Sequence, residues 1–291
     1  MKKDIAEDPR FAGYLEKGRY FDFETPYGYG GPLTDHPVPA DVQERFLCEL
    51  QEYAEAEGWV SQFVRFHPLL GNQNAMSDVF EIRYLHDTVY MDTESPEIIM
   101  TNMDSKNRNM VRKAVKNGIT IVQRPIIDYY DFIPIYETTM KRAQAADYYF
   151  FDEEYFKAQA ELKNNSCILY AMKEGKPVAA AILYYNDRYM HYHLAGTLTE
   201  FRQFAPGNLL LYEAALLACK KGIHSFHLGG GMTQDDKLFG FKKQFNKNGR
   251  LPFYIGRTIF SKDVYKELME VREKSDPGFN VGNTRMIQYR A

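Results

Sequence analysis

The sequence predicts an α/β protein with a mixed sheet, arranged as two subdomains of related plan. Of its 291 residues 45% are hydrophobic and 26% charged, a composition typical of folded rather than disordered chains. This length suffices for one large or two small domains. Short β-rich runs alternate with amphipathic helical runs, and no low-complexity linker separates the two halves.

The second half gives the clearer series of elements. After a first strand we expect helices capped by Asp131 and Asp152, then three antiparallel strands joined by the turn sequences Glu-Gly-Lys-Pro and Asn-Asp. A long apolar helix ending at Gly222, a strand running into three glycines, a helix, a strand and a last helix follow. The predicted ranges are 119–123, 167–172, 178–185, 188–195, 208–221, 224–228, 235–245, 253–260 and 262–274.

The first half repeats this order more loosely. We expect a helix over 41–57, strands over 60–66, 79–85 and 88–92, and a helix over 105–117, with the last two strands joined across His86 and Asp87. The sequence therefore predicts a degenerate first subdomain, residues 1–118, and a second subdomain, residues 119–291.

Charge, cysteine content and hydropathy exclude several classes of protein. A net charge of −3 gives no overall attraction to nucleic acid, and we expect no DNA partner. Cys48, Cys167 and Cys219 are too few and scattered for a disulfide framework or a zinc site, which predicts a cytoplasmic location. The start lacks the apolar stretch of a secretory signal, and the longest apolar run, residues 209–219, is too short to span a bilayer.

Two basic runs without acidic residues segregate the positive charge. In residues 106–118, Arg108 and Arg112 share a helix face and are candidates for binding an acceptor. In residues 237–250, Lys242 lies between two phenylalanines and is a candidate for stabilising an oxyanion, while Lys243 is a candidate donor contact. The first run is either a phosphate-binding surface or a solvated cationic face. Two such runs in a chain of net charge −3 favour an anionic ligand such as a nucleotide, CoA or RNA, whose phosphate Lys242 could also bind.

The strand over 188–195 carries histidines with a period of two. This spacing places His191 and His193 on one face together with Tyr189. They are candidate general bases for an attacking amine, a metal pair, or structural histidines; we find no third metal ligand and expect no metal.

Two glycine-containing segments are candidate donor sites. Gly229, Gly230 and Gly231 follow a strand, where backbone N–H groups can bind an anion; the alternative is a flexible loop. The segment with Arg202, Ala205, Gly207 and Asn208 precedes a helix N-terminus, which favours negative charge.

The tyrosines and phenylalanines, 22 and 20 in number, provide candidates for stacking on a substrate. Tyr27 and Tyr29 are expected to bind the acceptor through their rings and hydroxyl groups. Packing in the core is the alternative for each of them.

The second half resembles the FemABX-like branch of the GNAT acyltransferase superfamily. The residues that carry the resemblance are Leu210–Tyr212, Gly222, His227–Gly231 and Phe241–Phe245, with Ser105–Gly118 and Pro26–Pro32 in the first half. The family's ligand-contacting lysine falls on Lys242. GNAT enzymes hold the pyrophosphate of CoA with Gln/Arg-x-x-Gly-x-Gly/Ala, and here Ala205 replaces the first glycine.

The resemblance implies two GNAT-like subdomains and transfer of an acyl or aminoacyl group to an amine. The donor would be aminoacyl-tRNA or acyl-CoA as a co-substrate, with no tightly bound cofactor. The acceptor would be a small-molecule or peptidyl amine, such as that of a peptidoglycan precursor. The alternative is a non-catalytic GNAT-fold protein that binds a nucleotide or RNA. A tRNA is a candidate partner.

Overall fold

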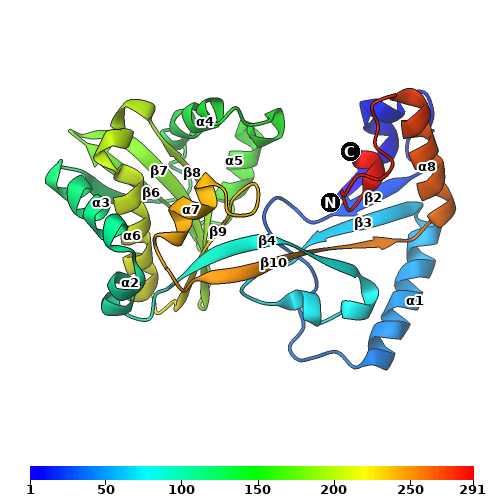
Figure 1. The fold of residues 1–291 in the computed structure, drawn as a ribbon, viewed down its shortest axis with the longest axis horizontal. Helices are drawn as coiled ribbons and strands as arrows, with labels where there is room; N and C mark the ends of the chain where they lie inside the picture. Colours follow the sequence, from blue (N-terminus) through cyan, green and yellow to red (C-terminus); the bar gives the residue numbers. More distant parts are fainter. The chain divides into compact units, whose positions relative to one another are not determined.

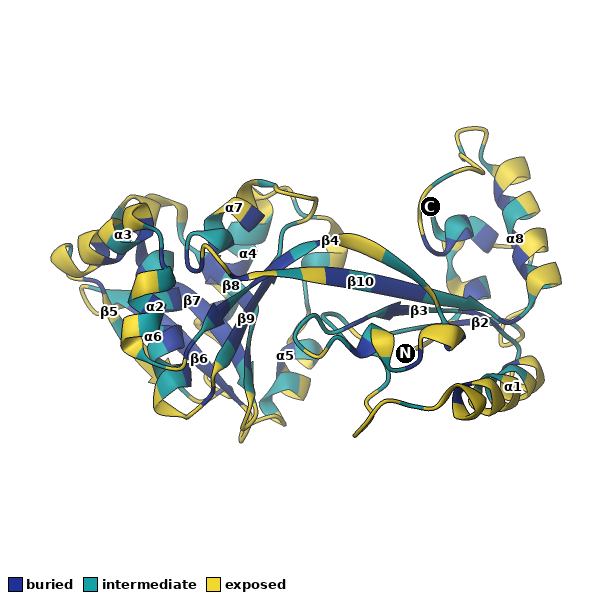
Figure 2. Ribbon diagram, turned by 60° about the horizontal axis from the view of Figure 1, so that its bottom comes forward, coloured by how far each residue is buried: buried dark blue, intermediate teal, exposed yellow.

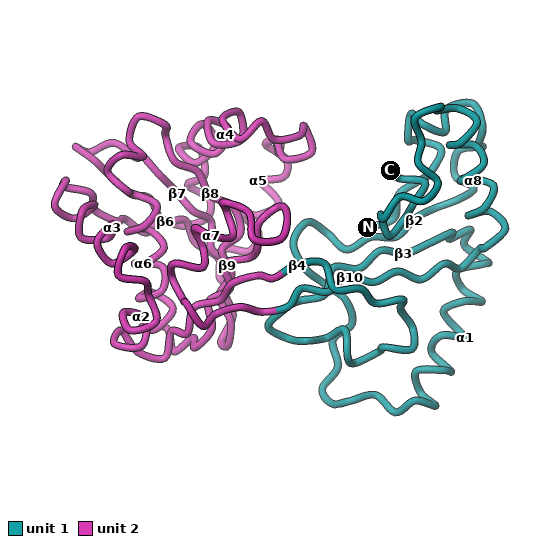
Figure 3. Tube along the Cα trace, viewed as in Figure 1, with its two compact units in different colours: residues 1–86, 252–291 teal, residues 87–251 magenta.

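The computed structural model describes all residues, 1–291, and divides them into two compact units (Figure 3). Unit 1 contains residues 1–86 and 252–291, and unit 2 contains residues 87–251. This division differs from the expected boundary after Gly118. The helix before Gly118 packs on a later helix of unit 2, whereas most of the final strand and the whole final helix belong to unit 1. The boundary between the units depends on contacts between residues that are far apart in the sequence, and the order of elements along the chain does not reveal those contacts.

The ten strands form a mixed sheet in the order β1-β2-β3-β10-β4-β9-β8-β7-β6-β5. Among the pairings that fix the site, β5–β6, β6–β7, β7–β8 and β4–β9 are antiparallel, whereas β8–β9 is parallel. The predicted α/β class with a mixed sheet is therefore confirmed. The strands are β1 (Lys2–Asp4), β2 (Phe21–Glu24), β3 (Trp59–Arg65), β4 (Glu81–Asp92), β5 (Thr120–Arg124), β6 (Ser166–Lys173), β7 (Lys176–Tyr185), β8 (Tyr189–Thr197), β9 (Ser225–Gly230) and β10 (Arg250–Ile259).

Helices cover both faces of the unit 2 sheet (Figure 1). The apolar helix α6 packs on β6 and β7 with α2 and α3 outside it, and α4 packs on the other face with α5 beside it. The strand residues between these layers are buried, as the dark blue of β6 and β7 in Figure 2 shows. The helices of both units are α1 (Ala40–Ala56), α2 (Pro96–Asn102), α3 (Ser105–Lys116), α4 (Phe132–Arg142), α5 (Glu153–Ala160), α6 (Pro206–Lys220), α7 (Lys237–Lys243) and α8 (Lys262–Ser275).

The predicted elements of the second half occur close to their expected ranges, and the hairpins β6–β7 and β7–β8 are present. Asp152 caps α5 by accepting a hydrogen bond from the Tyr155 amide at 2.8 Å. The predicted cap at Asp131 is wrong, because this carboxylate accepts from Arg124 at 2.9 Å instead and Asp131 already has helical backbone angles.

The predicted turn at His86 and Asp87 is also wrong, because β4 runs through both residues without a break. The imidazole of His86 packs edge-on against Phe253, with 5.3 Å between ring centroids. The carboxylate of Asp87 forms an ion pair with Arg250. These contacts with β10 hold both residues in extended conformation, although their polarity suggests a turn.

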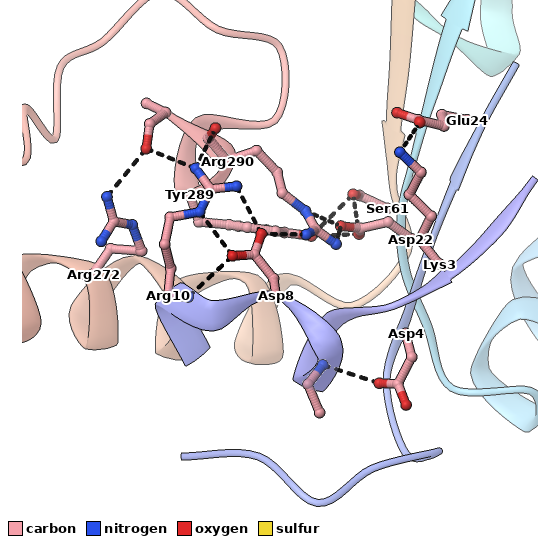
Figure 4. A network of polar contacts seen from close by, with 12 residues as sticks. Lys3, Asp4, Asp8, Arg10, Asp22, Glu24, Ser61, Arg272, Tyr289 and Arg290 are labelled. Carbon is pink, nitrogen blue, oxygen red and sulfur yellow. Dashed lines mark hydrogen bonds and ion pairs between the residues drawn. The ribbon is translucent and has the colours of Figure 1, made fainter. Parts of the chain in front are cut away.

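In unit 1 a buried carboxylate ties β2 and β3 to the last residues of the chain (Figure 4). Asp22, only 6% exposed, accepts two hydrogen bonds from the Arg290 guanidinium at 2.9 and 2.7 Å. The hydroxyl groups of Ser61 and Tyr289 donate to its other oxygen. Such a group is tolerated inside a protein only when its charge and lone pairs are satisfied, as they are here.

Candidate active site

The sheet of unit 2 opens between its two parallel strands. The register of β8 with β9 comprises three residue pairs and ends at His191 opposite His227. From Tyr192 to Thr197, β8 continues to pair with β7 but no longer with β9. We call this place the fork. Beyond it, the β9-facing edge of β8 has no strand partner, and an extended ligand can pair with this edge as far as Gly196. At Thr197 the backbone N–H donates to the Thr139 hydroxyl and the C=O accepts from Arg142, so that residue is not open.

A β-bulge in β8 lies directly at the fork. Tyr192 lies opposite Leu183 and Leu194 opposite Ile182, so His193 is the extra residue. The rings of His191 and His193 lie on one face, with centroids 6.1 Å apart, as the period of two predicts. The bulge then shifts the alternation for the rest of the strand, a feature found often beside active sites.

His193 is enclosed by tyrosines on the face covered by α4 and α5. Its Nε2 lies 2.5 Å from the Tyr155 hydroxyl of α5, and its ring packs on Tyr184 with centroids 4.3 Å apart. Burial lowers the pKa of His193 to about 3, so the imidazole is neutral at physiological pH. It is therefore a weak proton acceptor.

His191 begins a chain of hydrogen bonds that leads into the sheet. Its Nδ1 lies 3.2 Å from Nδ1 of His227, and the two rings are stacked with centroids 5.3 Å apart. Nε2 of His227 lies 3.0 Å from the Thr88 hydroxyl on β4. His227 and Thr88 are fully buried, whereas His191 is partly exposed.

Lys242 approaches the fork from the face covered by α6. Its Nζ donates to the carbonyl of Gly230 at 2.7 Å and lies 5.8 Å from the ring centroid of Tyr192. Burial lowers the pKa of Lys242 to about 8, although the charge of Asp236 acts in the opposite direction. Below that pH the ammonium is a buried positive charge beside the fork, which can stabilise an oxyanion or hold a phosphate.

The three glycines form the end of β9 and the link to α7. Gly229 has a φ of +74°, the left-handed region that favours glycine. A Cβ on Gly231 would lie 2.0 Å from an oxygen of Asp236. That carboxylate caps α7 by accepting from the Phe239 amide at 2.8 Å and also accepts from the Met232 amide at 2.6 Å. The glycines thus shape the segment whose carbonyl contacts Lys242. Lys243, the next residue, is half-buried at the end of α7.

The loop after β8 leads into the N-terminus of α6. Ala205 stands at the helix N-cap with a φ of +57°, a conformation that glycine adopts at less cost. At Gly207 a side chain would meet Thr197 at 3.6 Å. The Asn208 amide donates to Asn107 of α3 at 2.7 Å, which fixes the start of the helix.

Two arginines stand beside this helix N-terminus. Arg202 is exposed in the 3-10 turn Thr199–Phe204, and Arg142 at the end of α4 donates to the Thr197 carbonyl at 2.8 Å. Burial and then the charge of Arg202 lower the pKa of Arg142. Two neighbouring positive charges at a helix N-terminus form a suitable site for a phosphate group.

The predicted acceptor residues occupy different places. Tyr27 and Tyr29 belong to unit 1, where the ring of Tyr29 packs on Phe253 at 5.1 Å and burial raises the pKa of its hydroxyl. In unit 2, the Arg108 guanidinium donates to backbone carbonyls at the end of α2, including Met100 at 3.1 Å. Arg112 is exposed and donates to Asn109. Their role in binding an acceptor stays a prediction.

Several residues of this site were not predicted from the sequence. They include Thr88, Asn107, Arg142, Tyr155 and His227. His227 lies in the segment with the three glycines and Asn107 lies in the basic run 106–118, so the segments were predicted but the roles of these two residues were not. Thr88, Arg142 and Tyr155 come from distant elements and carry no local pattern.

A surface hollow of about 240 Å³ lies elsewhere in unit 2, between α6 and the edge strand β5. Its lining includes Gln123, Glu213 and Lys220 but none of the residues of the fork. We place the candidate site at the fork because the charged, titratable and strand-edge groups converge there.

Comparison with known proteins agrees with this geometry. Residues 106–243 match the acetyltransferase (GNAT) domain family. The crystal structure of FemX superposes with a TM-score of 0.63 at 14% identity, covering 92% of this chain and 89% of that one. The chain has a FemX-like GNAT fold. No curated protein matches it in sequence.

Other solved structures share this FemX-like GNAT fold. L-PGS from Bacillus licheniformis has a TM-score of 0.58 at 12% identity, covering 88% of this chain and 82% of that one. The C-terminal domain of a putative lysylphosphatidylglycerol synthetase from Agrobacterium fabrum has a TM-score of 0.57 at 14% identity, covering 88% and 81%. The resemblance to the FemABX-like branch is thereby confirmed for the fold.

Two further structural findings concern metals and membranes. No group of three or more His, Cys, Asp or Glu side chains is placed to hold a metal ion. None of the helices combines the length and the apolar character needed to cross a bilayer.

Proposed function

We propose that this protein is an N-acyltransferase that moves an acyl or aminoacyl group from a phosphate-bearing donor to an amine. The observation that carries the proposal is the fork, which is flanked by Lys242 on one face and His191 on the other. Arg202 and the N-terminus of α6, which are suited to binding phosphate, come immediately after β8 in the chain. The match of residues 106–243 to the GNAT domain supports the same reaction class.

In this proposal the donor lies along the open edge of β8. Its phosphate groups bind at the N-terminus of α6 with Arg202 and Arg142, and its acyl end reaches the fork. The edge from Tyr192 to Gly196 is about 13 Å long, at about 3.3 Å per residue. An extended arm with amide groups can pair with this edge, which favours acyl-CoA as the first donor to test and aminoacyl-tRNA as the second.

The reaction is a direct attack of the amine nitrogen on the donor carbonyl carbon. A C–N bond forms, and the C–S bond of a thioester or the C–O bond of an ester breaks with its electron pair on the leaving atom. The amine's proton passes to a base, for which His191 is placed, and then to the leaving group. The Lys242 ammonium stabilises the oxyanion while the bonds change.

Donor binding and turnover are measured separately to test the proposal. Thermal shift with acetyl-CoA, CoA and aminoacyl-tRNA reports binding, and release of free thiol or deacylated tRNA with a panel of amines reports transfer. We expect Arg202→Ala to weaken donor binding at least tenfold, because charge-assisted hydrogen bonds contribute about 1.5–3 kcal/mol. Arg45→Ala, an exposed arginine of α1 in unit 1, is the matched control.

Binding without turnover of any donor would favour the alternative, a non-catalytic binding protein for a nucleotide or RNA. Absence of both would contradict the proposal. A cytoplasmic location, a tRNA partner and a peptidoglycan precursor as acceptor stay predictions.

A further inference from the structure

Strand β5 forms an outer edge of the sheet, where it pairs with β6 on one side only (Figure 2). The pairing runs from Thr120 to Arg124 without a register shift. Alternate residues of such a strand direct their backbone N–H and C=O groups away from β6, where another strand can pair with them. The opposite edge of the sheet is β1, a three-residue strand that begins with Lys2 and Lys3, and both its shortness and its lysines discourage pairing between chains. Strand β5 is longer and contains neither lysine nor proline.

Exposed apolar side chains are concentrated around this edge. Val122 on β5 is 39% exposed, and Val115, Ile127 and Tyr130 in the flanking segments are more than half exposed. Eight large apolar side chains of unit 2 are exposed, and these four lie within residues 115–130. Such a concentration, unlike apolar residues scattered singly, indicates a surface that associates with another protein surface.

The hollow of about 240 Å³ between β5 and α6 adjoins the same edge. Ile121 and Gln123 line it from the strand, and Leu216 and Leu217 line it from the helix. Both leucines are partly exposed to solvent. A strand added beside β5 brings side chains over this hollow and removes apolar area from water, which favours association.

Two opposite charges of α6, Glu213 and Lys220, also line the hollow. They are seven residues apart and therefore lie on the same side of the helix, about 10 Å from each other along its axis. That separation is too long for an ion pair between them. Burial raises the pKa of Glu213, so the carboxylate is already partly removed from water and gains from a cation brought close to it.

We propose that β5 is a homodimer interface, at which two copies of the chain pair their β5 strands antiparallel about a twofold axis perpendicular to the sheet. This symmetry places both α6 helices on the same face of the joined sheet and reverses the direction of the second one. The Glu213 side of each helix then faces the Lys220 side of the other, and the charge pair forms twice. A second copy is the occupant because one surface supplies the strand edge, the apolar residues, the acid and the base. This interface goes beyond the proposed acyl transfer and does not depend on it.

Sedimentation of the full chain over a series of concentrations measures the oligomeric state. We expect a species of twice the 33.9 kDa mass of one chain at the highest concentrations. A species of the mass of one chain at every concentration would overturn the proposal.

Val122→Lys tests whether β5 is the interface. It places a lysine from each copy near the twofold axis, and like charges on paired strands oppose association. We expect the dimer dissociation constant to rise by about tenfold or more. Leu238→Lys, at an exposed leucine of α7 in the same unit, is the matched control and should leave the constant unchanged. A dimer that Val122→Lys does not weaken would contradict the assignment to β5.

Charge reversal tests the orientation of the two copies. Glu213→Lys and Lys220→Glu should each weaken the dimer by about threefold or more, because each replaces two attractive pairs by repulsive ones. The double variant exchanges the two charges and should regain the wild-type dissociation constant. A double variant that shows the sum of the two losses would contradict the antiparallel arrangement.

Amide hydrogen exchange locates the interface without any substitution. Those N–H groups of residues 120–124 that face away from β6 should exchange more slowly at concentrations where the dimer forms, whereas the amides of β1 should not change. Slower exchange at other amides, with no change over 120–124, would overturn the proposal.

Discussion

Replacing Lys242 by methionine should make the protein more stable at neutral pH while it abolishes transfer. Burial lowers the pKa of this lysine from 10.5 to about 8. Because one pKa unit corresponds to about 1.4 kcal/mol, keeping the ammonium charged inside the fold costs about 3 kcal/mol. Methionine removes that cost and loses one hydrogen bond to the Gly230 carbonyl, about 1 kcal/mol. The expected net gain is about 2 kcal/mol.

The stability difference between the wild type and Lys242→Met should depend on pH in a defined direction. Below pH 8 the folded and unfolded chains both hold the proton, and the wild type bears the whole cost of the buried charge. Between about pH 8 and 10.5 the folded lysine is neutral while the unfolded one is still protonated, so wild-type stability rises relative to the variant. The advantage of Lys242→Met should therefore shrink by about 3 kcal/mol across this interval.

Urea unfolding followed by circular dichroism at pH 7 and pH 10.5 measures both numbers. Lys247→Met, at an exposed position of unit 2, is the control and should change stability by less than about 0.5 kcal/mol. A variant that is less stable by the same amount at both pH values would refute the reasoning. Wild-type transfer should decline as the pH rises through about 8, and Lys242→Met should lose about 10²- to 10³-fold in kcat.

Three further predictions concern backbone and buried charge. Gly231→Ala forces a methyl group into the carboxylate that caps α7 and should lower the free energy of unfolding by more than 1 kcal/mol. Gly240→Ala, with open space around it, is the control and should raise the free energy of unfolding by up to about 1 kcal/mol. Thermal unfolding distinguishes the two variants. Ala205→Gly relieves the left-handed alanine before α6 and should raise stability by less than about 1 kcal/mol in the same assay, and a fall would contradict the strain. Arg290→Ala leaves the buried Asp22 without its cation and should cost about 3–5 kcal/mol in urea unfolding; a loss below 1 kcal/mol would contradict the buried ion pair.

Local patterns account for what could be predicted about the fold. The hairpins β6–β7 and β7–β8 follow from alternating apolar residues and short turns, and α6 follows from its apolar run and the glycine after it. Errors arose where a distant contact opposed the local signal. Asp87 is a residue type that is common in turns, but its ion pair with Arg250, far along the chain, keeps β4 extended.

The sequence by itself determined some of the residue types of this protein's site and the order of the elements in its second half. Lys242, His191 and the glycines could be singled out because their chemistry and spacing are visible in a short stretch. Only the tertiary structure decided which of these groups meet. The parallel pairing of β8 with β9 brings His191 next to His227, although α6 separates the two strands in the sequence. Strand β4 adds Thr88 from a distant part of the chain. Such pairings depend on burial and hydrogen bonding summed over the whole sheet, and no local periodicity encodes them.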